Sequence, residues 1–250
     1  MSTWIFLRGL TREARHWGDF VATFGAAIGD ADVLTPDLPG NGHLYRRQSP
    51  LSVAAMAEYC RAELQARGIA PPYRLLAMSL GAMVAVAWAH EHPEEISACV
   101  LINTSLRPFS PFYRRLRPRA YPALLKLALR GTASEAWDEA ILRLTSKRAG
   151  NSAGILSAWN AYRREYPVSR RNALRQLLAA SRYCAPAAKP PVPVLVLAGA
   201  QDALVDPACS RRLAQCWQAD FAEHPTAGHD LPLDDGAWVA RQVRHWLRGM

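Results

Sequence analysis

The stretch "LLAMSLGAM" (75–83) sets one serine inside an apolar run, with Ala77 two residues before Ser79 and Gly81 two residues after it. The residues that follow, "LGAMVAVAWAHEHP" (80–93), are apolar nearly all round, which is typical of a buried helix. Small residues on both sides of a serine permit a sharp strand–turn–helix bend, a pattern usually written GxSxG and here begun by alanine. The pattern indicates a displayed, nucleophilic serine. Taken alone, it also fits a serine that caps a helix.

Short β-rich runs alternate with helical stretches along most of the chain. This alternation predicts an α/β fold, with a mainly parallel sheet and helices on both of its faces. We expect six strands, at 4–9, 32–38, 73–78, 96–105, 192–199 and 219–225. We expect helices at 14–29, 51–68, 80–93 and 234–249. Two of the runs, 96–105 and 192–199, are continuously apolar, as in strands that are covered on both faces.

Residues 106–188 show no convincing strand, and we expect a helical insert there. Thr132 and Glu135 form a capping-box pattern before one apolar helical stretch. Ser169 is the expected cap of the last helix of the insert. Apolar residues at helical spacing mark the helices: Trp137, Ala140, Ile141 and Leu144, then Ile155, Leu156, Trp159 and Tyr162, then Ala173, Leu174, Leu177 and Leu178.

The predicted organisation is a core formed by 1–105 and 189–250, with 106–188 as a cap over it. The net charge of +9 gathers in the cap, because 106–186 hold 16 Lys and Arg against 4 Asp and Glu. A basic cap attracts anions. The arginines and large apolar residues of 112–130 suggest an acidic carrier protein, the phosphates of coenzyme A or an anionic membrane surface as a partner. The alternative is a solvated arginine-rich surface, and no recognition motif supports nucleic acid.

Composition narrows the class of protein. The sequence contains no run of about 18 apolar residues, so we expect no transmembrane helix. The N-terminus lacks the features of a signal peptide. The five cysteines are odd in number, irregularly spaced and without a CxxC pair. We therefore expect reduced thiols in a cytoplasmic protein, and neither a metal nor a cofactor is implied.

A serine nucleophile needs a base and an acid that orients it. Asp202 comes just after the apolar strand of "VLVLAGAQDALVDP", and His229 lies in a glycine turn after the next strand, in "HPTAGHDLP". Both positions are carboxyl ends of strands, where ligands bind in open α/β sheets. Asp206 is a rival acid, although it precedes a proline and fits the cap of the next helix.

Other polar residues are weaker candidates. His16 follows the first strand and could line the pocket. The remaining histidines fit turns, strands or helices: His43, His90, His92, His224 and His245. Asp230 and Asp234 fit turns or helix caps.

These stretches, together with "FLRG", "PDLPGNGH" and "TAGHD", resemble the α/β-hydrolase superfamily, and most closely its small cytosolic carboxylesterases, such as pimeloyl-carrier-protein methyl esterases. The resemblance implies Ser79 as the nucleophile, His229 as the base and Asp202 as the acid of a triad that cleaves an ester or thioester. It implies the backbone N–H groups of Leu10 and Leu80 as the oxyanion hole. The insert falls where this family carries its cap, and no cofactor is implied.

The chain departs from the family pattern at its N-terminal end. The family usually has two strands before the one that matches 4–9, so we expect a short sheet. That strand ends in Arg8-Gly9 where the family often has His-Gly. Arg8 is expected to bind a substrate carboxylate or phosphate, or alternatively to brace the loop in an ion pair. Two other functions stay open: a lyase or C–C hydrolase that uses the triad as a base, and a non-catalytic binding protein.

Overall fold

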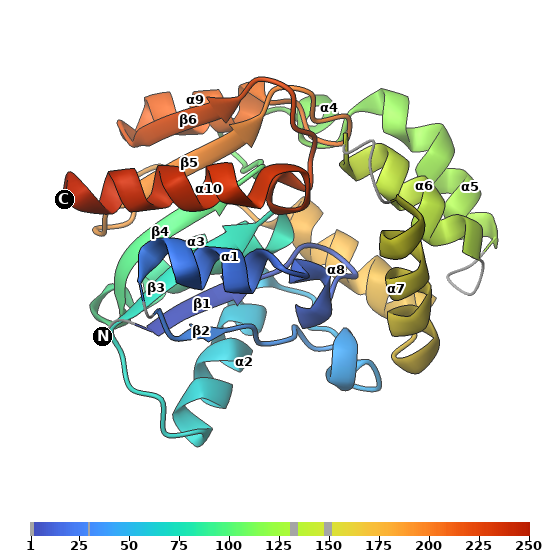
Figure 1. Cartoon of the computed structure of the whole chain (residues 1–250), viewed down its shortest axis with the longest axis horizontal. Coiled ribbons are helices and arrows are strands. Elements are labelled where there is room, and N and C mark those ends of the chain that lie inside the picture. The colour runs from blue at the N-terminus through green and yellow to red at the C-terminus, as the bar shows by residue number, and fades with distance from the viewer. Residues whose placement is uncertain (1–2, 30, 131–134, 148–151) are drawn as a thin grey trace.

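The computed structural model describes residues 3–29, 31–130, 135–147 and 152–250 of the chain. Its centre is one six-stranded sheet in the order β2-β1-β3-β4-β5-β6, in which every neighbouring pair is parallel (Figure 1). The strands are β1 (Thr3–Leu7), β2 (Val33–Leu34), β3 (Tyr73–Met78), β4 (Ile96–Ile102), β5 (Val194–Gly199) and β6 (Asp220–His224). The predicted α/β class, parallel sheet and number of strands are confirmed.

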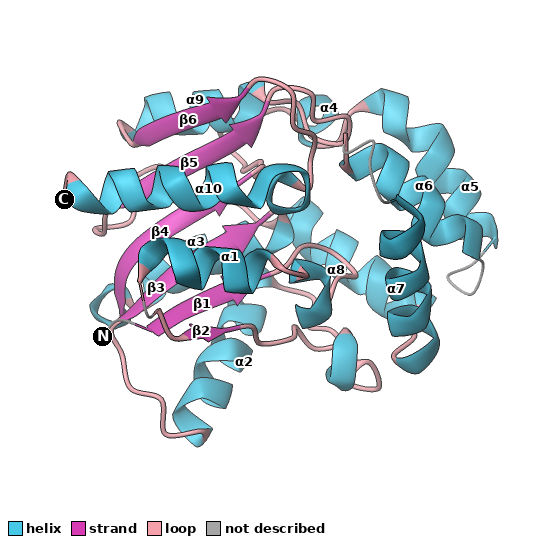
Figure 2. Cartoon of the chain, viewed as in Figure 1, coloured by secondary structure: helices cyan, strands magenta, loops and turns pink. Residues whose placement is uncertain are grey.

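Helices cover both faces of the sheet (Figure 2). Alternate residues of a strand face opposite sides, so β1 directs Trp4 and Phe6 into one hydrophobic cluster and Ile5 and Leu7 into the other. The first cluster lies under α1 (Phe20–Ile28) and α10 (Leu231–Arg248). The second lies under α2 (Val53–Ala66), α3 (Leu80–Glu91) and α9 (Ala208–Trp217). As predicted, α3 is buried nearly all round.

The cap helices gather beyond the end of the sheet to which the strand arrows point (Figure 1). They are α4 (Phe112–Arg115), α5 (Tyr121–Arg130), α6 (Glu135–Thr145), α7 (Ser152–Glu165) and α8 (Arg170–Arg182). No strand longer than a bridge occurs in the described part of 106–188, which confirms a helical insert. The bridge joins Arg107 to Cys184, so the two ends of the insert lie side by side. The division into a core and a cap at these bounds stays a prediction.

Helix α8 buries a mainly polar face and exposes the leucines that its apolar pattern predicts to be buried. Ser169 caps it as predicted, because its Oγ accepts the N–H of Asn172 at 3.1 Å. The side chains that α8 buries are Asn172, Gln176 and Ala179, whereas Leu174, Leu177 and Leu178 are exposed. The predicted capping residue Thr132 of α6 lies outside the described residues.

Several predicted elements, including the three that follow, differ in their bounds from those of the structure. The expected helix 14–29 is divided, because Gly18 adopts a φ of 52° between a short 3-10 turn and α1. β2 is only two residues long, since Pro36 follows closely and cannot donate to a ladder. α10 begins at Leu231, three residues before the predicted 234–249, and is kinked at Asp235.

Two expectations from composition can be compared with the structure. All five cysteines are free thiols. Within the described ranges, no helix has both the length and the apolar character needed to cross a membrane.

Candidate active site

Ser79 stands at a strained bend between β3 and α3. Its φ of 56° and ψ of −116° are unusual for a residue with a side chain. The bend is held because the Ser79 N–H donates to the carbonyl of Ile102 at 3.0 Å, and because α3 passes so close to β1 that a Cβ at Gly81 would overlap the carbonyl of Leu7. Ser79 occupies the N-cap position of α3, yet its side chain accepts no capping hydrogen bond. The capping alternative therefore does not explain this serine.

The hydroxyl of Ser79 faces the loop after β1. A Cβ built on Gly9 would lie 3.7 Å from Ser79 Oγ, so the two backbones meet there. The N–H groups of Leu10, in this loop, and of Leu80, at the first position of α3, donate no hydrogen bond to any described residue. The first N–H groups of a helix have no partner within that helix. Two free amides thus flank a hydroxyl that itself makes no hydrogen bond in the described part of the chain.

Asp202 and His229 form a buried pair at the ends of β5 and β6. His229 Nδ1 lies 2.6 Å from Asp202 Oδ2, and the two side chains are 3% and 1% exposed. Asp202 Oδ1 accepts the N–H groups of Leu204 and Val205 at 2.8 and 2.9 Å, which fixes the carboxylate. The rival Asp206 instead accepts the N–H of Ala208 at the start of α9 and makes no hydrogen bond or ion pair with His229. Of the two acids, the structure brings Asp202 to the imidazole.

The pKa of His229 reflects opposing influences. Burial by itself lowers this pKa, because a charged imidazolium loses its solvation. The negative charge of Asp202 and its hydrogen bond raise the pKa, with a smaller contribution from Asp230, and the net result is a pKa above the usual value of 6.5. The pair is therefore arranged to stabilise an imidazolium.

Asn103, at the end of β4, ties the strand ends together and was not singled out by the sequence. Its Nδ2 donates to the carbonyls of Gly228 and His229 at 3.0 and 2.7 Å, and its Oδ1 accepts the N–H of Gly199 at 2.9 Å. It adopts a φ of 47°. The sequence held one signal for this role, because Asn103 is a polar residue directly after the apolar residues of β4.

The position of Arg8 corrects the expectation that it binds substrate. Its guanidinium donates to both oxygens of Asp230, at 3.1 and 2.6 Å, and both side chains are buried. It also lies over the ring of Trp17, 4.7 Å from the centroid. Burial raises the pKa of Asp230, but the charge and hydrogen bonds of Arg8 outweigh this and lower it. Arg8 is thus already neutralised in an ion pair, the alternative that the sequence left open. Asp230 occupies the N-cap position of α10, but its side chain binds Arg8 and makes no capping hydrogen bond.

We expect Arg8→Gln to destabilise the protein by about 3–5 kcal/mol, because it leaves the buried Asp230 carboxylate without a charged partner. Chemical denaturation measures the free energy of unfolding. The double variant Arg8→Gln/Asp230→Asn removes both charges and should recover part of the loss. A double variant that is as unstable as the sum of the two single variants would refute this role for the pair.

His16, the other expected substrate contact, lies in a buried position beneath the cap. Its Nδ1 accepts the N–H of Glu13 at 3.2 Å, and its ring packs against Trp159 and Tyr162 of α7. Burial lowers the pKa of His16 well below 6.5, and the charges of Arg12 and Arg8 lower it further. It borders a cavity but makes no hydrogen bond, ion pair or ring contact with His229 or Asp202, and substrate binding by His16 stays a prediction.

Arginines of the basic cap hold the loop that carries Asp202. Arg117 Nη1 and Arg119 Nη2 donate to the Asp202 carbonyl at 2.8 and 3.4 Å. Arg115 donates to the carbonyls of Ala180 and Ser181. These side chains therefore have partners within the protein, and binding of an acidic carrier or an anionic membrane by the cap stays a prediction.

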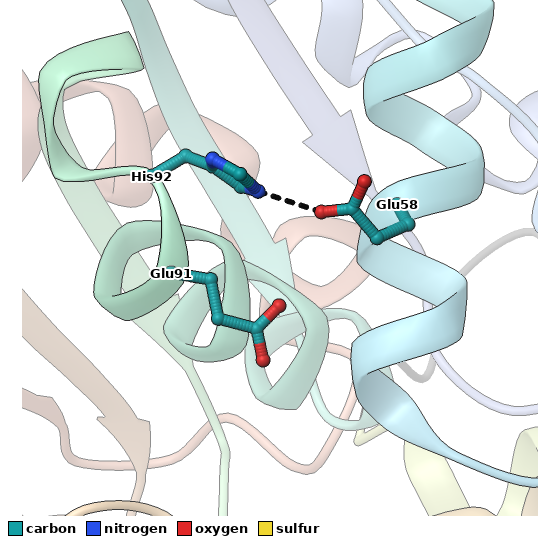
Figure 3. A group of neighbouring side chains, drawn as sticks. All are labelled: Glu58, Glu91 and His92. Carbon is teal, nitrogen blue, oxygen red and sulfur yellow. Dashed lines mark hydrogen bonds and ion pairs between the residues drawn. The ribbon is translucent and has the colours of Figure 1, made fainter.

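A separate group of side chains, of the types that can bind metals, lies where α2 meets the C-terminal end of α3 (Figure 3). α3 starts at the edge of the sheet that carries Ser79, so its last turn lies toward the opposite edge. His92 Nε2 is 2.7 Å from Glu58 Oε1, and Arg61 also donates to Glu58, while Glu91 is exposed nearby. These contacts join two helices at the surface and carry no chemistry at the candidate site.

Comparisons with known proteins agree with the fold. Residues 5–236 match the family model described as the alpha/beta hydrolase fold. The chain is 31% identical over 192 residues to the candidate carbamate hydrolase RutD of Klebsiella pneumoniae (strain 342). The aligned residues cover 74% of this chain and 68% of that protein.

Solved structures show the same fold. An esterase of Thermogutta terrifontis is 21% identical with a TM-score of 0.75, covering 100% of this chain and 90% of its own. The enol-lactonase of Burkholderia xenovorans LB400 is 21% identical with a TM-score of 0.80, covering 99% and 91%. Because the family model spans most of the chain and RutD is a relative over two thirds of its length, this chain belongs to the alpha/beta hydrolase fold family and is an enzyme of the hydrolase class.

Proposed function

We propose that the protein is a serine hydrolase that cleaves a carboxylic ester or thioester. Ser79 is the nucleophile, His229 the general base and Asp202 the acid that orients it. The observation that carries the proposal is the arrangement at three strand ends: a strained serine with a free hydroxyl after β3, and a buried acid–imidazole pair after β5 and β6. Such a set of groups is what acyl transfer through a covalent intermediate requires.

The reaction follows from these positions. Ser79 Oγ attacks the substrate carbonyl carbon while His229 Nε2 takes the hydroxyl proton. The carbonyl oxygen becomes an oxyanion, which the N–H groups of Leu10 and Leu80 stabilise. His229 then returns the proton to the leaving alcohol or thiol as the carbon–oxygen or carbon–sulfur bond breaks. Water, deprotonated by His229, releases the acid from the acyl-enzyme and restores Ser79.

Relatives suggest a second bond type. RutD is named as a candidate carbamate hydrolase, so a carbamate joins esters and thioesters as a substrate class to test. A turnover screen over matched acyl esters, thioesters and carbamates of the same acyl group separates these classes. Ester or thioester cleavage at the highest kcat/KM supports the proposal. Cleavage of carbamates alone would replace the proposed ester or thioester hydrolysis with carbamate hydrolysis at the same serine.

The pKa of His229 fixes the expected pH dependence. A general base works only when neutral, and the folded-state pKa of His229 is above 6.5. We therefore expect kcat/KM to rise with pH through a single ionisation above 6.5 and then to level off. In Asp202→Asn the main cause of the raised pKa is lost, so the midpoint of the residual activity should move to lower pH. A midpoint that is identical in the two proteins would assign the ionisation to another group.

A further inference from the structure

A cavity lies between the loop after β1 and the cap helices α6 and α7. The loop contributes Thr11, Arg12 and His16 to its lining, and the cap contributes Asp138 and Tyr162. Thr11 directly follows Leu10, whose N–H is a proposed oxyanion donor. The loop turns back on itself here, because the Arg12 N–H donates to the carbonyl of Gly9 at 3.2 Å. The cavity is thus lined by the chain neighbour of a proposed oxyanion donor.

Arg12 brings to this cavity a buried cation whose side chain has no hydrogen-bond acceptor among the described residues. Its side chain is 10% exposed, and its guanidinium lies over the ring of Trp159 at 3.9 Å from the centroid. Nη1 is 3.8 Å from Asp138 Oδ1, which is too far for a hydrogen bond, and Nη2 is buried with no partner in the part of the chain that the structure describes. Buried donors are nearly always satisfied, so an unpaired guanidinium edge at a cavity indicates a missing acceptor.

The neighbouring carboxylates have closer partners than Arg12. Asp138 Oδ2 accepts from Arg163 Nε at 2.8 Å. Glu13 is bound by Arg15 at both of its oxygens. Asp230 accepts two hydrogen bonds from Arg8. Burial, and then the nearby charge of Arg8, lower the pKa of Arg12 to about 10, so Arg12 still carries its charge at neutral pH.

His16 offers a second donor at the same cavity. Because its Nδ1 accepts the Glu13 N–H, the neutral ring carries its proton on Nε2. Nε2 makes no hydrogen bond to a described residue. Two guanidinium groups line the cavity, those of Arg12 and Arg163, and the second is already bound to Asp138. The cavity therefore offers a ligand the Arg12 guanidinium and one neutral N–H, and the carboxylates of Glu13 and Asp138 at its wall disfavour a ligand with two negative charges.

We propose that this cavity binds a carboxylate of the substrate, with Arg12 as the charged donor and His16 as a second donor, so that the enzyme cleaves half-esters or half-thioesters of dicarboxylic acids. The inference rests on the proposed hydrolase function. A planar guanidinium matches the two oxygens of a carboxylate, whereas a phosphate dianion would meet the acidic wall. The carboxylate anchors one end of the substrate while the ester at its other end reaches Ser79.

The test compares monomethyl and dimethyl esters of short unbranched diacids in wild type, Arg12→Gln and Arg67→Gln. Arg67 is an exposed residue after α2 and serves as the matched loss of one positive charge. In wild type, kcat/KM should favour the half-ester. In Arg12→Gln the ratio of half-ester to diester should fall about 10- to 100-fold, as expected for lost hydrogen bonds to a charged group. Arg67→Gln should keep the wild-type ratio. If Arg12→Gln does not fold, His16→Phe keeps a ring in place and should lower the ratio by a smaller factor.

Binding measurements separate this inference from the hydrolase proposal. Calorimetry with the sodium salts of the same diacids should detect binding to wild type that Arg12→Gln loses. A protein that hydrolyses esters but shows equal kcat/KM for half-ester and diester overturns the carboxylate site and leaves the hydrolase proposal intact. A protein that binds diacids through Arg12 but turns over no ester or thioester keeps the carboxylate site and overturns the hydrolase proposal. Competition with the bound diacid gives a further check. If inorganic phosphate displaces the diacid as effectively as another carboxylic acid does, the carboxylate assignment is overturned.

Discussion

Replacing Ser79 with alanine is expected to lower kcat by roughly a million-fold, to the residual rate that the remaining site supplies. The methyl group of alanine cannot attack a carbonyl carbon, and the free amides of Leu10 and Leu80 are left with only a weak effect. Folding should be maintained, because Ser79 Oγ makes no hydrogen bond in the described part of the chain that alanine would break. Circular dichroism and thermal melting establish the fold, and a sensitive ester assay measures the rate.

A matched variant makes this result specific. His229→Ala should cost about as much as Ser79→Ala, and the double variant should be little worse than either, since triad residues act as a unit. Losses that multiply in the double variant would show that the two residues act independently. Hydrolysis by Ser79→Ala at a rate near that of wild type would refute Ser79 as the nucleophile.

Asp202→Asn is expected to lower kcat by about ten-thousand-fold, while Asp206→Asn leaves it nearly unchanged. The asparagine oxygen can still accept the N–H groups of Leu204 and Val205, so the loop keeps its shape. Its amide nitrogen would then donate to His229 Nδ1 and force the proton onto Nε2. In that tautomer the imidazole cannot accept the hydroxyl proton of Ser79.

Asp206→Asn is the control for the same chemical change four residues away. Asp206 Oδ1 accepts the Ala208 N–H at 3.0 Å, a bond that asparagine can also make. We expect a change in the free energy of unfolding of about 1 kcal/mol or less, and a normal rate. The reverse order of the two rates would move the acid from Asp202 to Asp206.

The sequence predicts the fold and three of the candidate residues because their signals are local. Each strand is an apolar run that ends at a turn, and parallel strands deliver Ser79, Asp202 and His229 to one edge of the sheet. Small neighbours of Ser79 reflect the crowding at its bend. None of these features depends on how the cap is placed.

The roles of the arginines depend on distant contacts, which is why the sequence alone leaves Arg8 with two roles, substrate binding or an ion pair. Its partner Asp230 is 222 residues away along the chain. Arg12 stands out only once α6 and α7 are in place around it, with Asp138 already bound to Arg163. In α8 the apolar spacing misleads for the same reason, because Gln176 is buried by bonds to Thr11 and Asn41 that no pattern within the helix reveals.

Covalent labelling with a fluorophosphonate, followed by peptide mapping in a mass spectrometer, tests the nucleophile most directly. The probe mimics the charge and geometry of acyl transfer and is trapped by an activated serine. The proposed mechanism predicts one adduct, on the peptide that carries Ser79, formed quickly in wild type, slowly in Asp202→Asn and not at all in Ser79→Ala. An adduct on a different residue, or a protein that cleaves esters yet takes up no label at Ser79, would contradict it.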